Sequence, residues 1–356
     1  MEQLGLEGIL AAEKERRERL YRRSLPEKRT LVEALSCLSR EELDDMAYNL
    51  CLEGTEEMTF SALVETLAPA VCRFSERWLP SAFDDQYQAF RHIREQGGLA
   101  ADFRVDDERL DYLCGLGLLA VGAADGKLFW YMPEEVDAVF SRLDSPSYGQ
   151  AVQTNTEIMR LATGLLFYYG FLDYDRLFSM VSALLEEEQR IEFFSFMGVL
   201  LNGSCWQKNV VGHERGMSYH TVLDAAGIEA QQKEKDGLPF AEISYGKAYD
   251  AGEDGYIEAT DAYKGLAQFF MAQFGFDVLH AADTVGKILI LMQNGGSMKE
   301  VAAFLETLGE IEEEAAAAEL SRLVIELHGT TRLWRLKGHT PRELQENAAA
   351  LAGSLH

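Results

Sequence analysis

The chain has 356 residues, with 33 Lys and Arg against 59 Asp and Glu, and a formal net charge of −26. A hydrophobic content of 47% and an aromatic content of 10% can fill the cores of about two to four domains, which argues against disorder over most of the length. The negative charge repels phosphate backbones and anionic lipid surfaces, so sequence-independent DNA binding by the whole surface is not expected.

The five cysteines are odd in number and widely spaced, and the chain has no Cys-x-x-Cys pair. This pattern is typical of small buried thiols in a reducing cytosol and does not predict a zinc site. Met1-Glu2-Gln3 is followed by a charged helical segment instead of an apolar core, and no apolar run reaches the roughly 18 residues that span a bilayer. We therefore expect a cytoplasmic protein with no signal peptide and no membrane partner.

Residues 1–30 are expected to form a charged helical arm, the one locally basic part of the chain. Its arginines alternate with glutamates, which is typical of a solvated helix with i,i+4 ion pairs. The alternative is a docking arm for an acidic partner, for which Arg16, Arg19 and Arg23 are the candidate contacts.

Residues 31–72 are expected to form two or three short helices. Ser39 with Glu42 makes a capping box, and Thr59 can cap a second helix. The segment resembles the Rho N-terminal/SAP-like helical hairpin, through Leu38-Ser39, Glu42-Leu43, Met46-Ala47, Leu52, Gly54, Met58 and Leu63-Val64. That resemblance implies the hairpin fold and contact with nucleic acid. The sequence departs from the family at residues 59–61, where a Lys is usual.

Residues 73–147 predict a winged-helix-like unit. Helices over 81–97 and 106–114 are followed by strands over 118–121 and 128–132, a Gly-rich turn over 122–126, and a helix restarting at Pro133. A helix that reads the major groove needs Lys, Arg, Asn or Gln toward the DNA. The helix over 106–114 instead carries Asp106, Asp107, Glu108 and Asp111 against the single Arg109.

Residues 148–260 predict a second winged-helix-like unit. Helices are expected over 155–169, 174–185 and 188–201, and a hairpin from strands over 206–211 and 217–222. The third helix is apolar almost all round, which predicts burial, and it opens on Glu186, Glu187, Glu188 and Glu192. The Gly- and Asp-rich stretch 233–260 is expected to be irregular.

Residues 261–356 predict a bundle of about three to five helices, from three apolar stripes at helical spacing. The stripes are Leu266, Phe269, Phe270 and Phe274; Val301, Phe304, Leu305 and Leu308; and Leu320, Leu323, Val324 and Leu327. Ser297 with Glu300 predicts a further capping box.

The string TRLWRLKGHTPREL at residues 331–344 combines a helix start with a tight reversal. Thr340, Pro341 and Glu343 form the helix start, and Gly338 permits the reversal. The string resembles a segment of bacterial proteins that carry a SEC-C zinc motif just downstream, which implies a bacterial protein. No cysteine follows Cys205, so the zinc motif does not carry over.

Two hypotheses follow for this string. Trp334 is expected to insert between helices and to fix the string on the preceding bundle. The alternative is that Trp334 and Arg335 form an exposed patch that contacts a partner.

No motif of catalysis stands out. His213 and His220 lack the further ligands and the spacing of a metal site, and neither a Gly-x-Ser-x-Gly elbow nor a phosphate loop occurs. We therefore assign no catalytic, cofactor-binding or metal-binding residue.

The sequence predicts a mostly α, α-dominated α+β protein. Its parts are the arm (1–30), the SAP-like helical hairpin (31–72), two winged-helix-like units with small β-hairpins (73–147 and 148–260) and a C-terminal helical bundle (261–356). The first hypothesis for function is a non-catalytic protein-interaction or regulatory module whose partner is another protein. The alternative is a nucleic-acid-linked regulator that uses the basic arm and the hairpins, although the charge predicts weak nucleic-acid binding. The third is an enzyme with an unrecognised site, and the sequence leaves the oligomeric state open.

Overall fold

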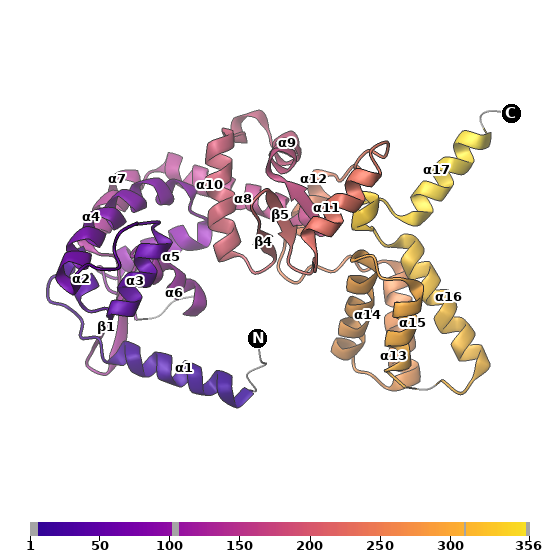
Figure 1. The fold of residues 1–356 in the computed structure, drawn as a ribbon, viewed down its shortest axis with the longest axis horizontal. Helices are drawn as coiled ribbons and strands as arrows, with labels where there is room; N and C mark the ends of the chain where they lie inside the picture. Colours follow the sequence, from indigo (N-terminus) through magenta and orange to yellow (C-terminus); the bar gives the residue numbers. More distant parts are fainter. Residues whose placement is uncertain (1–5, 102–106, 310, 354–356) are drawn as a thin grey trace. The chain divides into compact units, whose positions relative to one another are not determined.

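The computed structural model describes residues 6–101, 107–309 and 311–353, and the chain divides into two compact units, Met1–Thr156 and Glu157–His356 (Figure 1). The described residues form seventeen α-helices and two small antiparallel sheets, so the expected α-dominated fold is confirmed. The first three expected segments lie within the first unit. Helix α8 (Pro146–Tyr169) passes through the boundary between the units.

The first unit begins with four helices, and the caps of the third and fourth were predicted. They are α1 (Leu6–Tyr21), α2 (Leu31–Ser36), α3 (Arg40–Asn49) and α4 (Phe60–Trp78). Ser39 and Glu42 form the reciprocal capping box of α3, and the Thr59 hydroxyl accepts a hydrogen bond from the Ala62 amide at the start of α4. The apolar faces of α2, α3 and α4 pack together, with Leu43, Leu63 and Leu67 fully buried.

The rest of the first unit is built around the predicted hairpin. It contains α5 (Asp84–Glu95), α6 (Asp107–Gly115), β1 (Ala120–Ala124), β2 (Lys127–Tyr131) and α7 (Glu134–Leu143). Ala124 pairs with Lys127, so the turn is shorter than the expected 122–126. Asp125 and Gly126 both have positive φ, which is the requirement of a two-residue type I′ turn. Asp106, the first residue of the expected helix, lies outside the described residues.

The second unit continues from α8 with a small three-stranded sheet and four further helices. The elements are β3 (Phe171–Asp173), α9 (Tyr174–Leu184), α10 (Phe193–Trp206), β4 (Val210–Gly212), β5 (Gly216–Tyr219), α11 (Ala225–Glu234) and α12 (Tyr245–Ala251). The strand order is β3-β5-β4, and all pairs are antiparallel. The hairpin of β4 and β5 was predicted, but its first strand was expected from residue 206, and Trp206 instead ends α10. Strand β3 was not predicted, because three residues are too short for an alternation pattern.

Two expectations for this part were wrong. The helix expected over 188–201 begins at Phe193, because residues 187–189 form a separate 3₁₀ turn and Glu192 is the N-cap. The stretch 233–260 is not irregular throughout, because α12 lies within it and Ser244 caps that helix. Helix α12 packs closely on α8: a Cβ on Gly164 would lie 1.8 Å from the carbonyl oxygen of Ala248.

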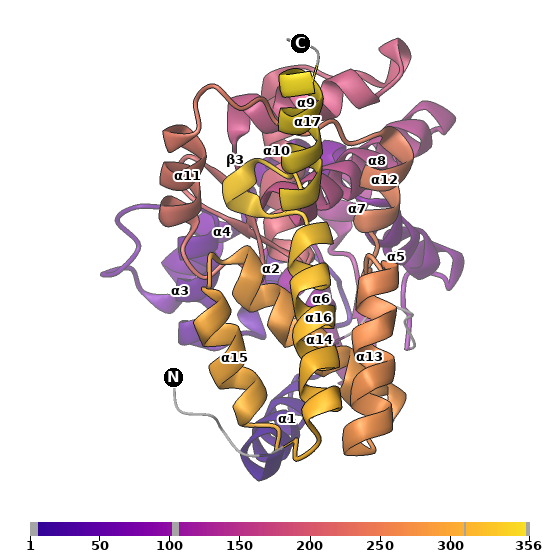
Figure 2. The ribbon, with the colours of Figure 1, turned by 90° about the vertical axis from the view of Figure 1, so that its right-hand side faces the viewer.

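Helices α13 (Asp261–Phe274), α14 (Val278–Gln293), α15 (Met298–Glu306) and α16 (Glu314–Thr330) lie side by side as the predicted bundle (Figure 2). The three apolar stripes pack into one core, to which α14 adds Val285 and Ile288. The capping box of Ser297 and Glu300 at the start of α15 is also as predicted.

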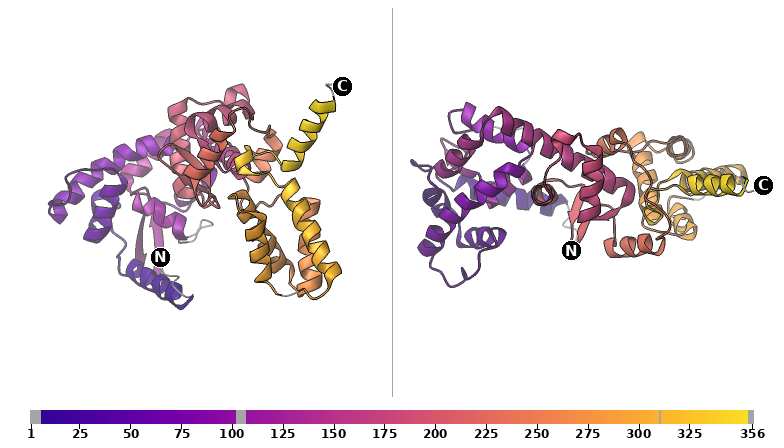
Figure 3. Two further views of the ribbon diagram at one scale, coloured as in Figure 1. Left: turned by 45° about the vertical axis from the view of Figure 1, so that its right-hand side comes forward. Right: turned by 90° about the horizontal axis from the view of Figure 1, so that it is seen from above.

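Residues 331–340, here called the latch, join the bundle to the sheet-containing part of the second unit. Leu333 belongs to the bundle core, whereas the fully buried Trp334 lies against Gly170 after α8. The Trp334 indole N–H donates a hydrogen bond to the Phe167 carbonyl at 3.0 Å. The latch therefore contacts more than the bundle on which it was expected to lie. Helix α17 (Pro341–Gly353) follows and projects from its unit (Figure 3).

Candidate functional site

Helix α10 carries an apolar surface that is open to solvent. Phe194 is 88% exposed and Leu201 is 58% exposed, and they are separated by two turns, so they lie on one face of the helix. Met197 between them is half-buried, and Cys205 continues the same face as an exposed residue. The expected burial of the whole helix is therefore wrong. The opposite face, with Phe196, Val199 and Leu200, is the one that packs inside. The expected burial of the cysteines is wrong for Cys205, as it is for Cys37 and Cys51, which are also exposed.

Exposed carboxylates border the N-terminal end of this α10 face. Glu186, Glu187, Glu188 and Glu192 are all exposed, and α10 itself has no Lys or Arg. The nearby Arg190 guanidinium donates to the Leu185 carbonyl at 3.3 Å. Asn202, which could otherwise read a base, is buried within the unit. The surface combines an apolar stripe with an acidic border, which is a different chemistry from that of a DNA-reading helix.

Helix α6 of the first unit, which lies just before the hairpin of β1 and β2, is also unsuited to a phosphate backbone. Its arginine, Arg109, lies 3.5 Å from the Asp85 carboxylate. The Asp111 carboxylate accepts from the guanidinium of Arg16 at 2.7 Å. Carboxylates of the same unit therefore compensate the charges of both Arg109 and Arg16.

The three candidate contact residues of the arm differ in ion pairing and in exposure. Arg16 is paired with Asp111, and Arg23 is paired with Glu42. Both side chains are largely covered, whereas Arg19 is exposed. The arm packs through Leu20 on Val121 and Leu128 of the hairpin. Ion pairs and packing thus hold Arg16 and Arg23 against their own unit.

The two candidate contacts in the latch are not alike either. Trp334 is 0% exposed, and Arg335 is half-buried. The Lys337 ammonium is also buried and donates to the carbonyls of Lys235 and Leu238, both at 2.8 Å. These contacts give the latch a structural role in joining segments that are far apart in the sequence.

A pocket of about 370 Å³ lies in the second unit, lined by residues of α8, the hairpin, the loop after α12, and helices α14 and α16. This volume falls in the usual range of small-molecule sites, about 300–1,000 Å³. Phe167 is at the centre of its aromatic cluster: the ring centroids of Tyr168, Tyr219 and Tyr256 lie 5.1, 5.5 and 5.3 Å from that of Phe167, all edge-to-face. Aliphatic side chains of α14, among them Leu289 and Ile290, form another part of the wall.

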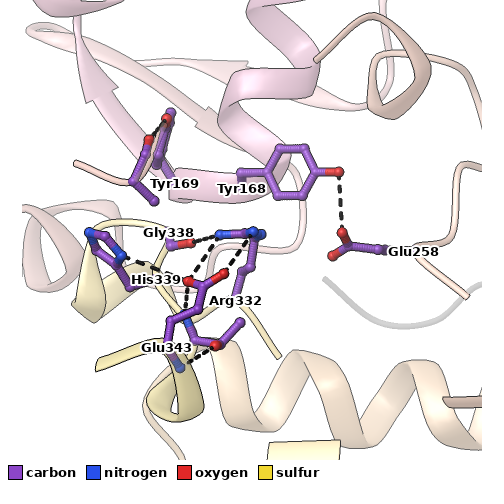
Figure 4. Close-up of polar contacts among 9 residues, drawn as sticks. Tyr168, Tyr169, Glu258, Arg332, Gly338, His339 and Glu343 are labelled. Atoms are coloured by element: carbon purple, nitrogen blue, oxygen red, sulfur yellow. Dashed lines mark hydrogen bonds and ion pairs between the residues drawn. The ribbon is translucent and has the colours of Figure 1, made fainter. Parts of the chain in front are cut away.

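Two charged side chains line this pocket, and their surroundings differ (Figure 4). The Arg332 guanidinium donates to the Gly338 carbonyl at 2.7 Å and lies 3.1 Å from the Glu343 carboxylate. Its charge is therefore compensated inside the protein. The Glu258 carboxylate faces the Tyr168 hydroxyl at 3.5 Å, a long and weak hydrogen bond. No cation lies within ion-pair distance of Glu258 among the residues that the structure describes.

The tyrosine hydroxyls that line this pocket, and that of Tyr168 beside it, stay protonated. Burial raises the pKa of Tyr219 to about 12 and raises the pKa of Tyr168 and of Tyr263 above the ordinary tyrosine value. Hydrogen bonding to Tyr256 and the nearby Glu258 charge add to the upward shift of the Tyr168 pKa. At neutral pH these groups are uncharged hydrogen-bond donors, so they bring no negative charge of their own.

Neither the exposed face of α10 nor the pocket was predicted from the sequence. An all-apolar helix was interpreted as a buried one, although a chain can leave one apolar face uncovered. The pocket has no motif, because its residues come from segments between Phe167 and Arg332. The available signals in the sequence were the aromatic run Phe167-Tyr168-Tyr169 and, far along the chain, Tyr256 and Glu258. Their spacing does not indicate that they lie together.

Within the described ranges, no three His, Cys, Asp or Glu side chains gather as metal ligands would, and no helix is both long and apolar enough to cross a bilayer. His213 contacts the Ser218 hydroxyl at 2.8 Å, and His220 contacts the Asn209 carbonyl at 3.3 Å.

Comparisons with family models, with curated proteins and with solved structures give no significant match.

Proposed function

We propose that this chain is a non-catalytic protein-interaction module of the bacterial cytoplasm and that the exposed face of α10 binds its partner. The observation that carries the proposal is the pair Phe194 and Leu201, large apolar side chains exposed on one face of a helix. Exposed aromatic and aliphatic side chains at helical spacing are typical of sites where a second helix docks.

The order of the elements supports a winged-helix assignment for the start of the second unit. Helix α8, strand β3, helices α9 and α10, and the hairpin of β4 and β5 follow one another, and the strand order is β3-β5-β4. In such a unit α10 stands in the position of the recognition helix. We infer that the unit keeps the scaffold and presents an apolar surface where DNA-binding relatives of the fold present cations. The first unit, with one bridge between Ala100 and Trp130 in place of a third strand, supports the same assignment less strongly.

Charge complementarity defines the partner. The exposed residues Glu187, Glu188 and Glu192 precede the apolar stripe at the N-terminal end of α10, and the whole chain carries a charge of −26. A helix with one apolar face flanked by Lys and Arg would bury its apolar side chains on Phe194 and Leu201 and place its cations beside these carboxylates. The proposed partner is therefore a protein with a basic amphipathic helix.

Replacing Phe194 or Leu201 by Ser should weaken binding of a designed Leu/Lys amphipathic helical peptide at least about tenfold. An apolar anchor at the centre of an interface contributes about 1–2 kcal/mol or more. Fluorescence anisotropy with the labelled peptide measures the effect. Leu223→Ser is the matched control, because Leu223 is 80% exposed in the same unit but lies outside α10.

A double charge-reversal variant, together with a second peptide of opposite charge, tests the charge of the partner. Glu188→Lys with Glu192→Lys should weaken the Leu/Lys peptide and strengthen a peptide in which Glu replaces each Lys. Thermal melts of all the variants should stay close to the wild type, since the altered side chains are exposed. Equal binding of both peptides to the wild type, or an equal loss with Leu223→Ser, would overturn the proposal.

Duplex DNA should bind no tighter than the nonspecific range, roughly 10⁻⁴–10⁻⁶ M at physiological salt. The reason is the sign of charge on α6 and before α10, together with the pairing of Arg16 and Arg23 with carboxylates. A gel-shift titration at two salt concentrations measures it. A nanomolar complex that resists salt would instead favour the nucleic-acid-linked regulator.

A further inference from the structure

The aromatic pocket of the second unit has a chemistry that the proposed protein interface does not use. It is lined by four aromatic side chains, Phe167, Tyr219, Tyr256 and Tyr263, and by the aliphatic side chains of α14. Its one charge without an ion-pair partner among the described residues is the carboxylate of Glu258. The other charged group, Arg332, is already neutralised by Glu343.

We propose that this pocket binds a small organic cation, an amine or quaternary ammonium on an apolar body, with Glu258 as the counter-ion. Aromatic rings attract a cation through the negative face of their π-systems, and aromatic-lined sites recognise alkylated ammonium groups in this way. A half-buried carboxylate that accepts only one weak hydrogen bond is stabilised when a cation binds in the pocket and forms an ion pair with it. The apolar body of the ligand lies against Leu289 and Ile290.

The same arguments disfavour the two other ligand classes. An anion would meet the Glu258 carboxylate and would have to compete with Glu343 for the Arg332 guanidinium. A neutral apolar molecule would fill the aliphatic part of the pocket and leave the carboxylate with its weak hydrogen bond. The tyrosine hydroxyls, which are neutral donors, neither supply a cation for an anionic ligand nor add repulsion against a cationic one.

Three probes of nearly equal shape test the charge directly by isothermal titration calorimetry on the full chain. They are 3-phenylpropylamine, 3-phenyl-1-propanol and 3-phenylpropanoate. The amine is expected to bind at least about tenfold more tightly than the alcohol, and the acid should bind most weakly. Benzyltrimethylammonium should also bind, because the aromatic side chains do not require an N–H donor.

Two variants locate the site. Glu258→Gln should weaken the amine about tenfold and leave the alcohol unchanged, whereas Glu306→Gln, an exposed carboxylate on α15, should change neither. Gly286→Leu should abolish binding of every probe, because Gly286 lines the pocket and a Cβ there would meet nothing within 4 Å. The thermal midpoint of this variant is measured alongside, and a midpoint that does not fall shows that the loss of binding comes from filling the pocket and not from unfolding.

Each contrary result has one meaning. Tighter binding of the acid than of the amine would assign the pocket to anions held by Arg332 and overturn the proposal. Equal binding of the amine and the alcohol would make it an apolar pocket without charge recognition, which also overturns it. Absence of saturable binding by any probe on the wild-type chain would do the same, whatever the variants show. None of these results bears on α10, which the peptide titrations test separately.

Discussion

Trp334→Ala should lower the free energy of unfolding of the second unit by about 3–5 kcal/mol, the usual cost of truncating a buried Trp. The side chain is fully buried against Gly170, and its indole N–H donates to the Phe167 carbonyl at 3.0 Å. For a unit of this size the thermal midpoint should fall by roughly 10 °C. Differential scanning calorimetry of the full chain measures it, with two units expected to give separate transitions.

Phe194→Ala is the control for this substitution, because it removes an aromatic ring that is almost fully exposed in the same unit. Its midpoint should stay within about 1–2 °C of the wild type, as surface substitutions usually do. If Trp334→Ala leaves the midpoint unchanged while it weakens partner binding, Trp334 belongs to an interaction surface and the structural role of the latch is wrong.

Gly164→Ala should destabilise the second unit by about 1–3 kcal/mol, although alanine is the better helix former. The added Cβ would lie 1.8 Å from the Ala248 carbonyl oxygen, which is a backbone atom, so α8 and α12 would have to move apart. Urea titration followed by circular dichroism measures the change.

Gly246→Ala makes the same chemical change in α12 and should act in the opposite direction. A Cβ on Gly246 would meet nothing within 4 Å, so the substitution should stabilise the helix by roughly 0.5–1 kcal/mol. Destabilisation by both variants would mean that the cost of Gly164→Ala does not come from the close approach of α8 and α12. A stabilising Gly164→Ala would show that the two helices do not approach closely.

Local chemistry explains why many element starts could be predicted from the sequence. Ser39, Thr59, Ser297 and Thr340 cap helices through contacts with residues no more than three positions away, so a short string contains the whole interaction. The hairpin of β1 and β2 was predictable for the same reason, because Asp125-Gly126 forms its own turn.

Features that depend on distant partners could not be predicted. Strand β3 exists because Phe171–Asp173 pairs with β5, more than forty positions away. The exposure of Phe194 depends on which face of α10 the rest of the unit covers, and periodicity does not distinguish the faces of a helix that is apolar all round. Glu258 and Phe167 approach the same pocket only after the chain has folded, so the candidate site left no motif.

The latch has a consequence for the order in which the protein is made. Trp334 fills the space beside Gly170 and binds the carbonyl of a residue 167 positions earlier. During synthesis, helix α8 and the sheet leave the ribosome long before the residue that completes their core. Until then the Phe167 carbonyl lacks the Trp334 donor, and an apolar surface stays open to aggregation or to a chaperone. We therefore expect the second unit to complete its folding only after the latch has emerged from the ribosome. Folding of a unit of about two hundred residues would then depend on a segment of ten.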